Sequence, residues 1–215
     1  PQIPTNNFIA AIAKLNNLSV HQLIKNIIEQ LTPFTFISLN NGDLIKIFSK
    51  SETNFRNNKE INLFLKWCQH YKEFVKYFKC SNLLGIKASN FKENIDKNVL
   101  SLVRVYFAFE NYKKYLANDN IKKDYNHIWE LASLPSKILH EDGINIIIIE
   151  RKIHAGVETI NLLCPEYSNI NSIYNENKPY SIILKEDNYF EIIVYLSCDG
   201  NNYQEDKIFS KDNLG

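Results

Sequence analysis

Cysteine and histidine are the residue types through which this chain could carry out nucleophilic catalysis. Cys68 and His70 lie only two positions apart, in a segment with helical spacing of its apolar residues. Residues two apart on a helix point about 200 degrees away from each other, so this thiol and this imidazole cannot exchange a proton. Cys164 precedes Pro165, and we interpret it as a structural thiol. If a cysteine of this chain acts as a nucleophile, Cys68 and Cys164 are the candidates. Each would need a histidine from elsewhere in the fold.

The residues that commonly bind metals or phosphate lack the spacing that such sites need. The four cysteines, at positions 68, 80, 164 and 198, contain no Cys-x-x-Cys motif, and the five histidines contain no His-x-x-x-His pair. The six glycines are scattered and do not form a phosphate-binding loop before a helix. We therefore predict no metal and no cofactor.

One cluster of basic residues could contact a phosphate backbone, and it consists of Lys113, Lys114, Lys122 and Lys123. The chain has 25 Lys and Arg against 24 Asp and Glu, so its net charge creates no field that attracts nucleic acid. We interpret the cluster as a solvated helix end, where the helix dipole favours cations. A role in binding DNA would require these lysines to converge on one face with other basic residues.

Several features bear on where the protein acts. The longest apolar run, residues 144–149, is far shorter than the roughly 20 residues that cross a bilayer, so we predict no membrane association. The N-terminus has no basic region followed by an apolar stretch and does not resemble a secretory signal. The few, widely spaced cysteines favour reduced thiols in a cytosolic setting. Methionine is absent, and we expect the chain to be excised from a longer protein.

Helical patterns dominate the first two thirds of the chain. They predict helices over 8–15, 19–31, about 60–78, about 99–117 and 124–134, the last capped by Asp124. Between the second and third helices, the turn Asn40-Asn41-Gly42-Asp43 separates two apolar runs and predicts a β-hairpin. The aromatic stripe of residues 106–115 is typical of a buried core.

Strand patterns follow from about residue 143. Runs at 144–150, 159–163, 180–185 and 189–196 predict four strands, with a final hairpin turning at 199–202. The first and third runs are almost continuously apolar, which is typical of central strands covered on both faces. The order favours an α+β fold with helices packed on a central mixed β-sheet. We expect one domain over 1–215, with a helical insertion at about 55–120.

The chain resembles the ovarian tumour (OTU) type cysteine proteases in three segments, which occur in the order that this family uses. They are the run Asn6-Asn7-Phe8-Ile9-Ala10-Ala11-Ile12, the helix Trp129-Glu130-Leu131-Ala132 before the strand at 144–149, and the run Asn188-Tyr189-Phe190-Glu191. The resemblance implies a papain-like cysteine protease scaffold. It also implies that Asn7 takes the slot of the nucleophilic cysteine and Asn188 the slot of the general-base histidine.

At every position where the OTU family carries a reactive or orienting residue, this chain has a different residue. Pro4 stands where the family usually has an aspartate, and Phe190 stands where it can have a polar orienting residue. The carboxamides of Asn7 and Asn188 are neither thiolates nor titrating bases, so these two slots cannot support acyl transfer. The resemblance therefore implies a scaffold with vestigial slots and no catalytic residues.

A second resemblance covers nearly the whole chain. The chain is similar to a module of large multidomain proteins of nucleocytoplasmic large DNA viruses, the mimivirus-like group, which look related to the large subunit of the poxvirus early transcription factor. The residues that carry it are Thr5-Asn6-Asn7-Phe8, Ala11-Ile12-Ala13 and the segments 41–48, 109–116, 127–131, 163–165 and 188–191. The resemblance implies a protein of the virion or of the virus factory in the host cytoplasm, with a role in viral transcription.

We expect a non-catalytic protein-interaction module, a pseudo-protease, whose partner is ubiquitin or a viral protein. One alternative is an active OTU-type deubiquitinase that uses Cys68 or Cys164, and another is a DNA-contacting transcription-factor domain. The arrangement of Asn7 and Asn188 is the sharpest expectation, because the proposed scaffold brings residues from both ends of the chain together. We expect their side chains within roughly 8 Å, about two extended-residue spacings, in a contact between neutral carboxamides.

Overall fold

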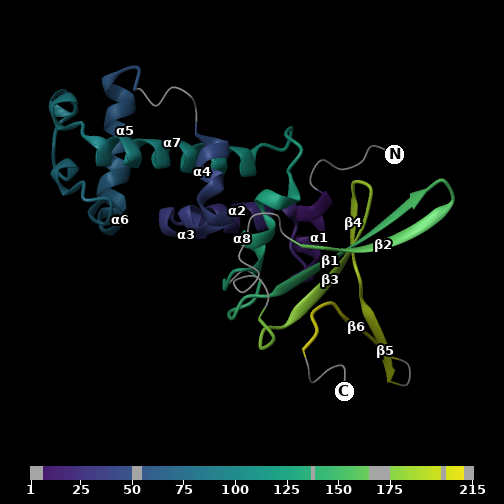
Figure 1. Ribbon diagram of the computed structural model, residues 1–215. Coiled ribbons are helices and arrows are strands. Elements are labelled where there is room, and N and C mark those ends of the chain that lie inside the picture. Colours follow the sequence, from purple (N-terminus) through teal and green to yellow (C-terminus); the bar gives the residue numbers. More distant parts are fainter. Residues whose placement is uncertain (1–6, 50–54, 137–138, 165–174, 200–201, 211–215) are drawn as a thin grey trace. The chain divides into compact units, whose positions relative to one another are not determined.

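The computed structural model describes residues 7–49, 55–136, 139–164, 175–199 and 202–210 (Figure 1). The chain forms two compact units, one made of Pro1–Gln30 with Leu116–Gly215 and the other of Leu31–Tyr115. The second unit is thus inserted into the first. The insertion begins at residue 31, earlier than the expected range of about 55–120.

The first unit contains a four-stranded sheet in the order β2-β1-β3-β4. Its strands are β1 (Asn145–His154), β2 (Val157–Leu163), β3 (Tyr180–Glu186) and β4 (Tyr189–Ile192). β1 runs parallel to β3, whereas β1 with β2 and β3 with β4 are antiparallel pairs. The expected α+β class with a mixed sheet is confirmed.

The sheet buries one face more completely than the other. Ile148 of β1 pairs with Ile183 of β3, and both side chains are fully buried. The neighbouring Ile147, Ile149 and Leu184 point to the other face and are only half-buried among the described residues. The expectation that both faces are covered is therefore wrong for the part of the chain that the structure describes.

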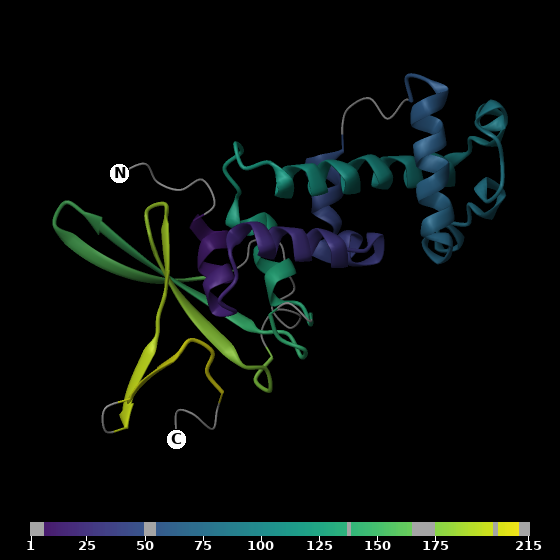
Figure 2. The ribbon, with the colours of Figure 1, turned by 180° about the vertical axis from the view of Figure 1, so that it is seen from behind.

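The helices of the first unit are α1 (Asn7–Leu15), α2 (Val20–Gln30) and α8 (Trp129–Ser133), with the short 3₁₀ turn η5 (Tyr125–His127). α1 is apolar around most of its circumference and lies beside β4 (Figure 2). The single helix expected over 124–134 is wrong, because Ile128 interrupts it at φ −122°. Asp124 does act as a cap, since its carboxylate accepts a hydrogen bond from the Asn126 N–H at 3.0 Å.

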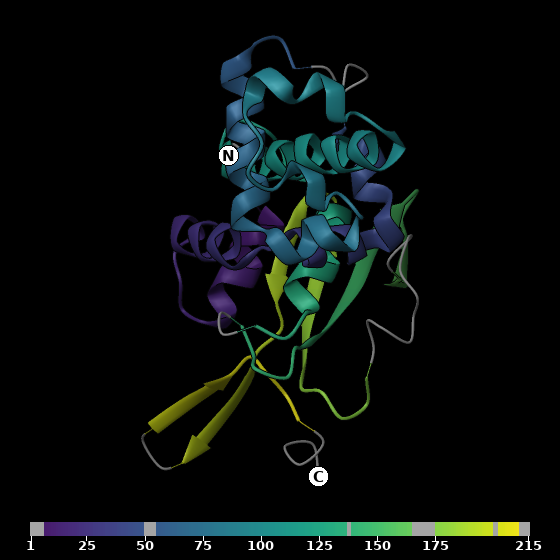
Figure 3. The same cartoon turned by 90° about the vertical axis from the view of Figure 1, so that its left-hand side faces the viewer.

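The strand expected over 189–196 is divided in two. β4 ends at Ile192, and β5 (Tyr195–Asp199) pairs with β6 (Asn202–Asp206) in a separate antiparallel hairpin (Figure 3). The predicted final hairpin is thus confirmed. Single-sequence alternation could not show the break, because β4 and β5 have the same pattern but pair with different partners.

The second unit is helical. It contains α3 (Pro33–Ser38), η1 (Leu39–Gly42), α4 (Asp43–Phe48), α5 (Asn58–His70), α6 (Lys72–Tyr77), η2 (Ser81–Leu83), η3 (Ala88–Asn90), η4 (Lys92–Asn94) and α7 (Lys97–Ala117), whose last two residues belong to the first unit. Phe109 and Tyr112 of the aromatic stripe are almost completely buried, as are Phe64 and Phe74 outside it. Tyr106, Phe107 and Tyr115 are half-buried, so the interpretation of the stripe as core is confirmed for part of it. The helix expected over about 60–78 is broken at Tyr71, which has φ −109° and ψ 50°.

The β-hairpin expected over residues 34–48 is wrong. Thr32 begins α3 by accepting the Thr35 N–H on its hydroxyl at 3.1 Å, and Pro33 occupies the first turn. Asn40, Asn41 and Gly42 all have positive φ and reverse the chain between two helices instead of two strands. Residues with positive φ occur in connections between helices as well as in β-hairpins. The turn alone therefore does not show whether helices or strands flank it.

Candidate functional site

The N-terminus of α1 meets the turn between β3 and β4. Asn7 donates a hydrogen bond from Nδ2 to the backbone carbonyl oxygen of Asn188 at 3.0 Å, across 181 positions of sequence. Asp187 and Asn188 form this two-residue turn, with Asp187 in the left-handed region at φ 52°. The predicted proximity of Asn7 and Asn188 is confirmed.

The details of this contact differ from the expectation. Asn188 lies in the turn before β4 and not on a strand, and its carboxamide does not face that of Asn7. Its Oδ1 instead accepts a hydrogen bond from Lys122 Nζ at 2.6 Å. Carbonyl groups in a tight turn lie outside the strand ladder, so the backbone oxygen is available to the amide at the helix end.

The segment after α7 folds around a buried ammonium group. Lys123 donates from Nζ to the backbone carbonyl oxygens of Asn118 and Ile121, the latter at 2.9 Å. Burial lowers the pKa of Lys123, and the nearby carboxylate of Asp119 opposes that shift. These hydrogen bonds set the conformation of the loop that carries Lys122.

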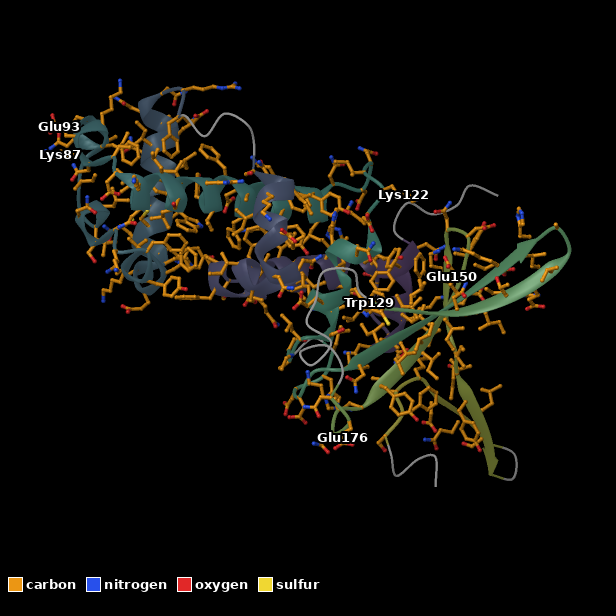
Figure 4. All side chains as sticks on the ribbon, in the orientation of Figure 1. Lys87, Glu93, Lys122, Trp129, Glu150 and Glu176 are labelled. Atoms are coloured by element: carbon orange, nitrogen blue, oxygen red, sulfur yellow. The ribbon has the colours of Figure 1, made fainter. Side chains whose placement is uncertain are left out.

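An aromatic cluster lies next to the two asparagines. Phe8 of α1 contacts Phe190 of β4 edge to face, with 5.3 Å between ring centroids, and Tyr125 of η5 lies 5.4 Å from Phe190 and 6.0 Å from Phe8. Trp129 extends the cluster from α8 and donates from Nε1 to the carbonyl oxygen of Ile146 at 3.1 Å, which attaches α8 to β1 (Figure 4). The cluster thus joins α1, the neighbouring elements η5 and α8, and β4, which lie in three separate parts of the sequence.

These groups surround a cavity of about 530 Å³, within the size range of typical ligand sites. Its wall combines the two asparagines, the three rings of Phe8, Tyr125 and Phe190, the segment 122–124, Lys185 near the end of β3 and Asp187 of the following turn. The cavity therefore has one aromatic side and one polar side. It lies at the two slots that the sequence singled out.

A buried ion pair supports the polar side of the cavity. Glu150 of β1 is 5% exposed and pairs with Lys185, its register partner on β3, and with Lys152 at 2.7 Å. The hydrogen bonds from Lys152 and Lys185 lower the pKa of Glu150 and outweigh the opposing effect of burial. Lys185 also lies with its Nζ 5.9 Å from the centre of the Tyr125 ring. The ion pair thus holds Lys185 against the aromatic cluster.

The two slots have no nucleophile and no titrating base. A carboxamide can donate and accept hydrogen bonds, but it cannot attack a carbonyl group or take up a proton at neutral pH. Phe190, in the orienting slot, is part of the aromatic cluster, and Pro4 lies outside the described residues. The arrangement is therefore suited to binding.

Cys68 has the surroundings of an inert structural thiol. It is completely buried on α5, whereas His70 is exposed, which confirms that the two side chains point in different directions. Burial raises the pKa of Cys68 to about 12, with a further contribution from Cys80, whose own pKa is raised by burial to about 11. A thiol that stays protonated to such a high pH is a poor nucleophile.

Cys164 is exposed directly after β2, but the strand register separates it from the histidine of the same hairpin. Leu163 pairs with Ile148, whereas His154 pairs with Val157 at the other end of the ladder. Six residues of strand correspond to about 20 Å, which is too far for proton transfer between Cys164 and His154. Of the two displaced candidates, neither shows an activating partner among the described residues.

The four lysines of the basic cluster differ in their surroundings. Lys113 lies 3.9 Å from Glu110 and 5.3 Å from the centre of the Phe109 ring, and Lys114 is exposed near the end of α7. Lys122 and Lys123 belong to the loop of the cavity described above. Lys113 therefore forms the kind of surface ion pair expected of a solvated helix.

Comparison with known proteins finds no match to this chain among protein-family models, curated proteins or solved structures. Within the described residues, no group of three His, Cys, Asp or Glu side chains is placed to hold a metal ion. The described helices also include none with the length and apolar character needed to cross a membrane.

Sequence reasoning missed Tyr125 and Lys185 as parts of the site. Tyr125 was included in an expected helix, and Lys185 was the last residue of an expected strand. A signal was present, because Lys185 comes three residues before Asn188 and alternation along β3 directs it to the same face as the buried Ile183. A charged residue on the buried face of a strand needs a partner, and Glu150 is that partner.

Proposed function

We propose that this chain is a non-catalytic protein-interaction module, a pseudo-protease that binds an extended segment of a partner protein in the cavity beside Asn7 and Asn188. The observation that supports the proposal is the hydrogen bond from Asn7 to the Asn188 carbonyl oxygen. It brings Asn7 and Asn188 into contact, as we expect if they occupy the two slots of an OTU-like scaffold.

The composition of the site favours binding over chemistry. Hydrogen-bonding groups of two neutral side chains stand beside three aromatic rings, and such a wall suits a chain that offers amides and apolar side chains. The buried ion pair and the buried Lys123 fix the surrounding loops. A preorganised surface loses little conformational entropy when its ligand binds.

The proposed setting is a multidomain viral protein of the virus factory or virion, with a role in viral transcription. The proposed partner is ubiquitin or another viral protein. This part of the proposal depends on the sequence resemblances, and the cavity provides a surface that such a partner could use.

The experiment combines a covalent probe with a binding measurement on the full chain. Ubiquitin carrying a C-terminal electrophile should form no adduct with any cysteine, as judged by intact mass. Peptides are first selected from a random library for binding to the wild-type chain. They should no longer bind to Asn188→Trp, in which the larger side chain fills the cavity. They should still bind to the control Tyr195→Ala, on the separate β5–β6 hairpin. Covalent labelling, or peptides that bind Asn188→Trp as well as the wild type, would overturn the proposal.

A further inference from the structure

Lys122 differs from the other two lysines of the cavity in its partners. Among the described residues its ammonium group contacts only the neutral Oδ1 of Asn188, and no carboxylate lies within 4.0 Å of it. Lys185 is paired with Glu150, and Lys123 donates to backbone carbonyl groups. An ammonium group has three donors, so Lys122 keeps capacity for an acceptor from outside.

The two asparagines also keep hydrogen-bonding capacity next to Lys122. Asn7 uses its Nδ2 and Asn188 uses its carbonyl oxygen and Oδ1 in the contacts within the described part of the chain. Among the described residues, Asn7 Oδ1 remains as an acceptor and Asn188 Nδ2 as a donor. One cation, one amide donor and one amide acceptor therefore lie together at the edge of the cavity.

The charges around the cavity favour a carboxylate over a phosphate group. Asp124 and Asp187 line the same cavity and would repel a dianion, and no arginine is among the lining residues to provide a bidentate contact. A carboxylate carries a single negative charge and can accept from Lys122 Nζ and Asn188 Nδ2 together. The aromatic side of the cavity would accommodate an apolar group attached to that carboxylate.

Building on the proposed function, we infer that the cavity recognises the C-terminal residue of a partner polypeptide, one with an apolar or aromatic side chain. Its α-carboxylate accepts hydrogen bonds from Lys122 and Asn188, and its own backbone N–H donates to Asn7 Oδ1. Its side chain packs on Tyr125 and Phe190. A C-terminal residue offers all three features within one residue, whereas an internal acidic residue separates its carboxylate from the backbone N–H.

The test uses three small probes and the ¹⁵N-labelled full chain. N-acetyl-phenylalanine carries the free carboxylate, N-acetyl-phenylalaninamide lacks it, and N-acetyl-aspartic acid α-amide carries the acid only on its side chain. The side-chain amide signals of Asn7 and Asn188 report binding. We expect saturable shifts of these signals with N-acetyl-phenylalanine and at least about tenfold weaker binding of the other two probes, because a charge-assisted contact is lost or misplaced.

Variants separate this inference from the proposed function. Lys122→Gln should weaken binding of the free acid about tenfold and weaken binding of the phenylalaninamide much less, because a neutral amide accepts a weaker hydrogen bond. The matched control Lys14→Gln, on the exposed side of α1, should change the binding of neither probe. Equal binding of acid and amide would overturn the carboxylate inference and leave peptide binding intact. If neither these probes nor the selected peptides shift the Asn7 and Asn188 signals, both proposals are wrong.

Discussion

At the scale of single residues, two asparagines and one lysine define the candidate site. Asn7 and Asn188 contact each other through one carboxamide and one backbone carbonyl group, and Lys122 binds the remaining carboxamide. The contact between Asn7 and Asn188 involves no titrating group. It should therefore keep its geometry across the neutral pH range.

Placing a thiol at position 7 and an imidazole at position 188 tests whether these two positions have a protease-like geometry. In the double variant Asn7→Cys with Asn188→His, the imidazole and Lys122 should both stabilise a thiolate at position 7. We expect this thiol to react with iodoacetamide at pH 7 several-fold faster than the thiol of Asn7→Cys alone, as measured by peptide mass spectrometry. Equal rates would show that the side chain at position 188 does not reach the slot.

The buried carboxylate of Glu150 gives a pH-dependent prediction. Its pKa is lowered in the folded chain, so it contributes stability that is present above its unfolded pKa and lost as the pH falls through its lower folded pKa. Glu150→Gln removes one partner of a buried pair and should cost about 3–5 kcal/mol at pH 7.

Urea unfolding of both proteins at pH 7 and in the acid range checks this prediction. The stability difference between wild type and Glu150→Gln should shrink as the pH falls below about 4. The matched control is Glu158→Gln, since Glu158 is half-exposed in its ion pair with Arg151 and should matter by less than about 1 kcal/mol. A difference that does not change with pH would contradict the assigned role of Glu150.

At the scale of elements, α1 and β4 are joined through an aromatic contact. Phe8 is 3% exposed and packs edge to face on Phe190. Phe8→Ala should cost about 3–5 kcal/mol because it leaves a cavity in the core. A double-mutant cycle with Phe190→Ala should give a coupling of about 0.5–1.5 kcal/mol in urea unfolding. Additive effects would show that the two rings do not act together.

The connection between α3 and α4 is a second element with a defined conformational requirement. Gly42 has φ 82°, and an added Cβ would meet only ordinary contact at 3.5 Å with the Ile37 carbonyl oxygen. Gly42→Ala should therefore cost about 1–2 kcal/mol through backbone strain alone. Thermal unfolding followed by circular dichroism measures this cost, and a neutral Gly42→Ala would contradict the left-handed conformation.

At the scale of the whole molecule, the chain is built from two units with separate cores. The unit of Leu31–Tyr115 has its own aromatic core, including Phe64, Phe74 and Phe109. A fragment of residues 31–117, which keeps all of α7, should fold alone. The expected result is a helical circular dichroism spectrum with cooperative urea unfolding and a near-ultraviolet aromatic signal. A gradual transition would mean that the unit depends on the rest of the chain.

The sequence by itself determined the elements whose periodicity is long and unambiguous. α7, the strands β1 to β3 and the aromatic core follow from apolar spacing, which directly reflects burial. Prediction from the sequence failed at residues 34–48, where the Asn-Asn-Gly turn is compatible with helices or strands. It also failed at 189–196, where alternation continues although β4 and β5 pair with different strands. Local preferences cannot distinguish such cases, because neighbours distant in sequence decide them.

The candidate site, like the fold, could be predicted only in part from the sequence. The sequence indicated Asn7 and Asn188 through a resemblance, and it established that neither side chain can act as nucleophile or base. Only the tertiary structure decided that Asn7 binds a backbone carbonyl group, that Lys122 faces Asn188, and that Glu150 meets Lys185 across two parallel strands. These contacts join residues 35 to 181 positions apart, and their geometry depends on how the sheet and helices pack, which no local pattern encodes.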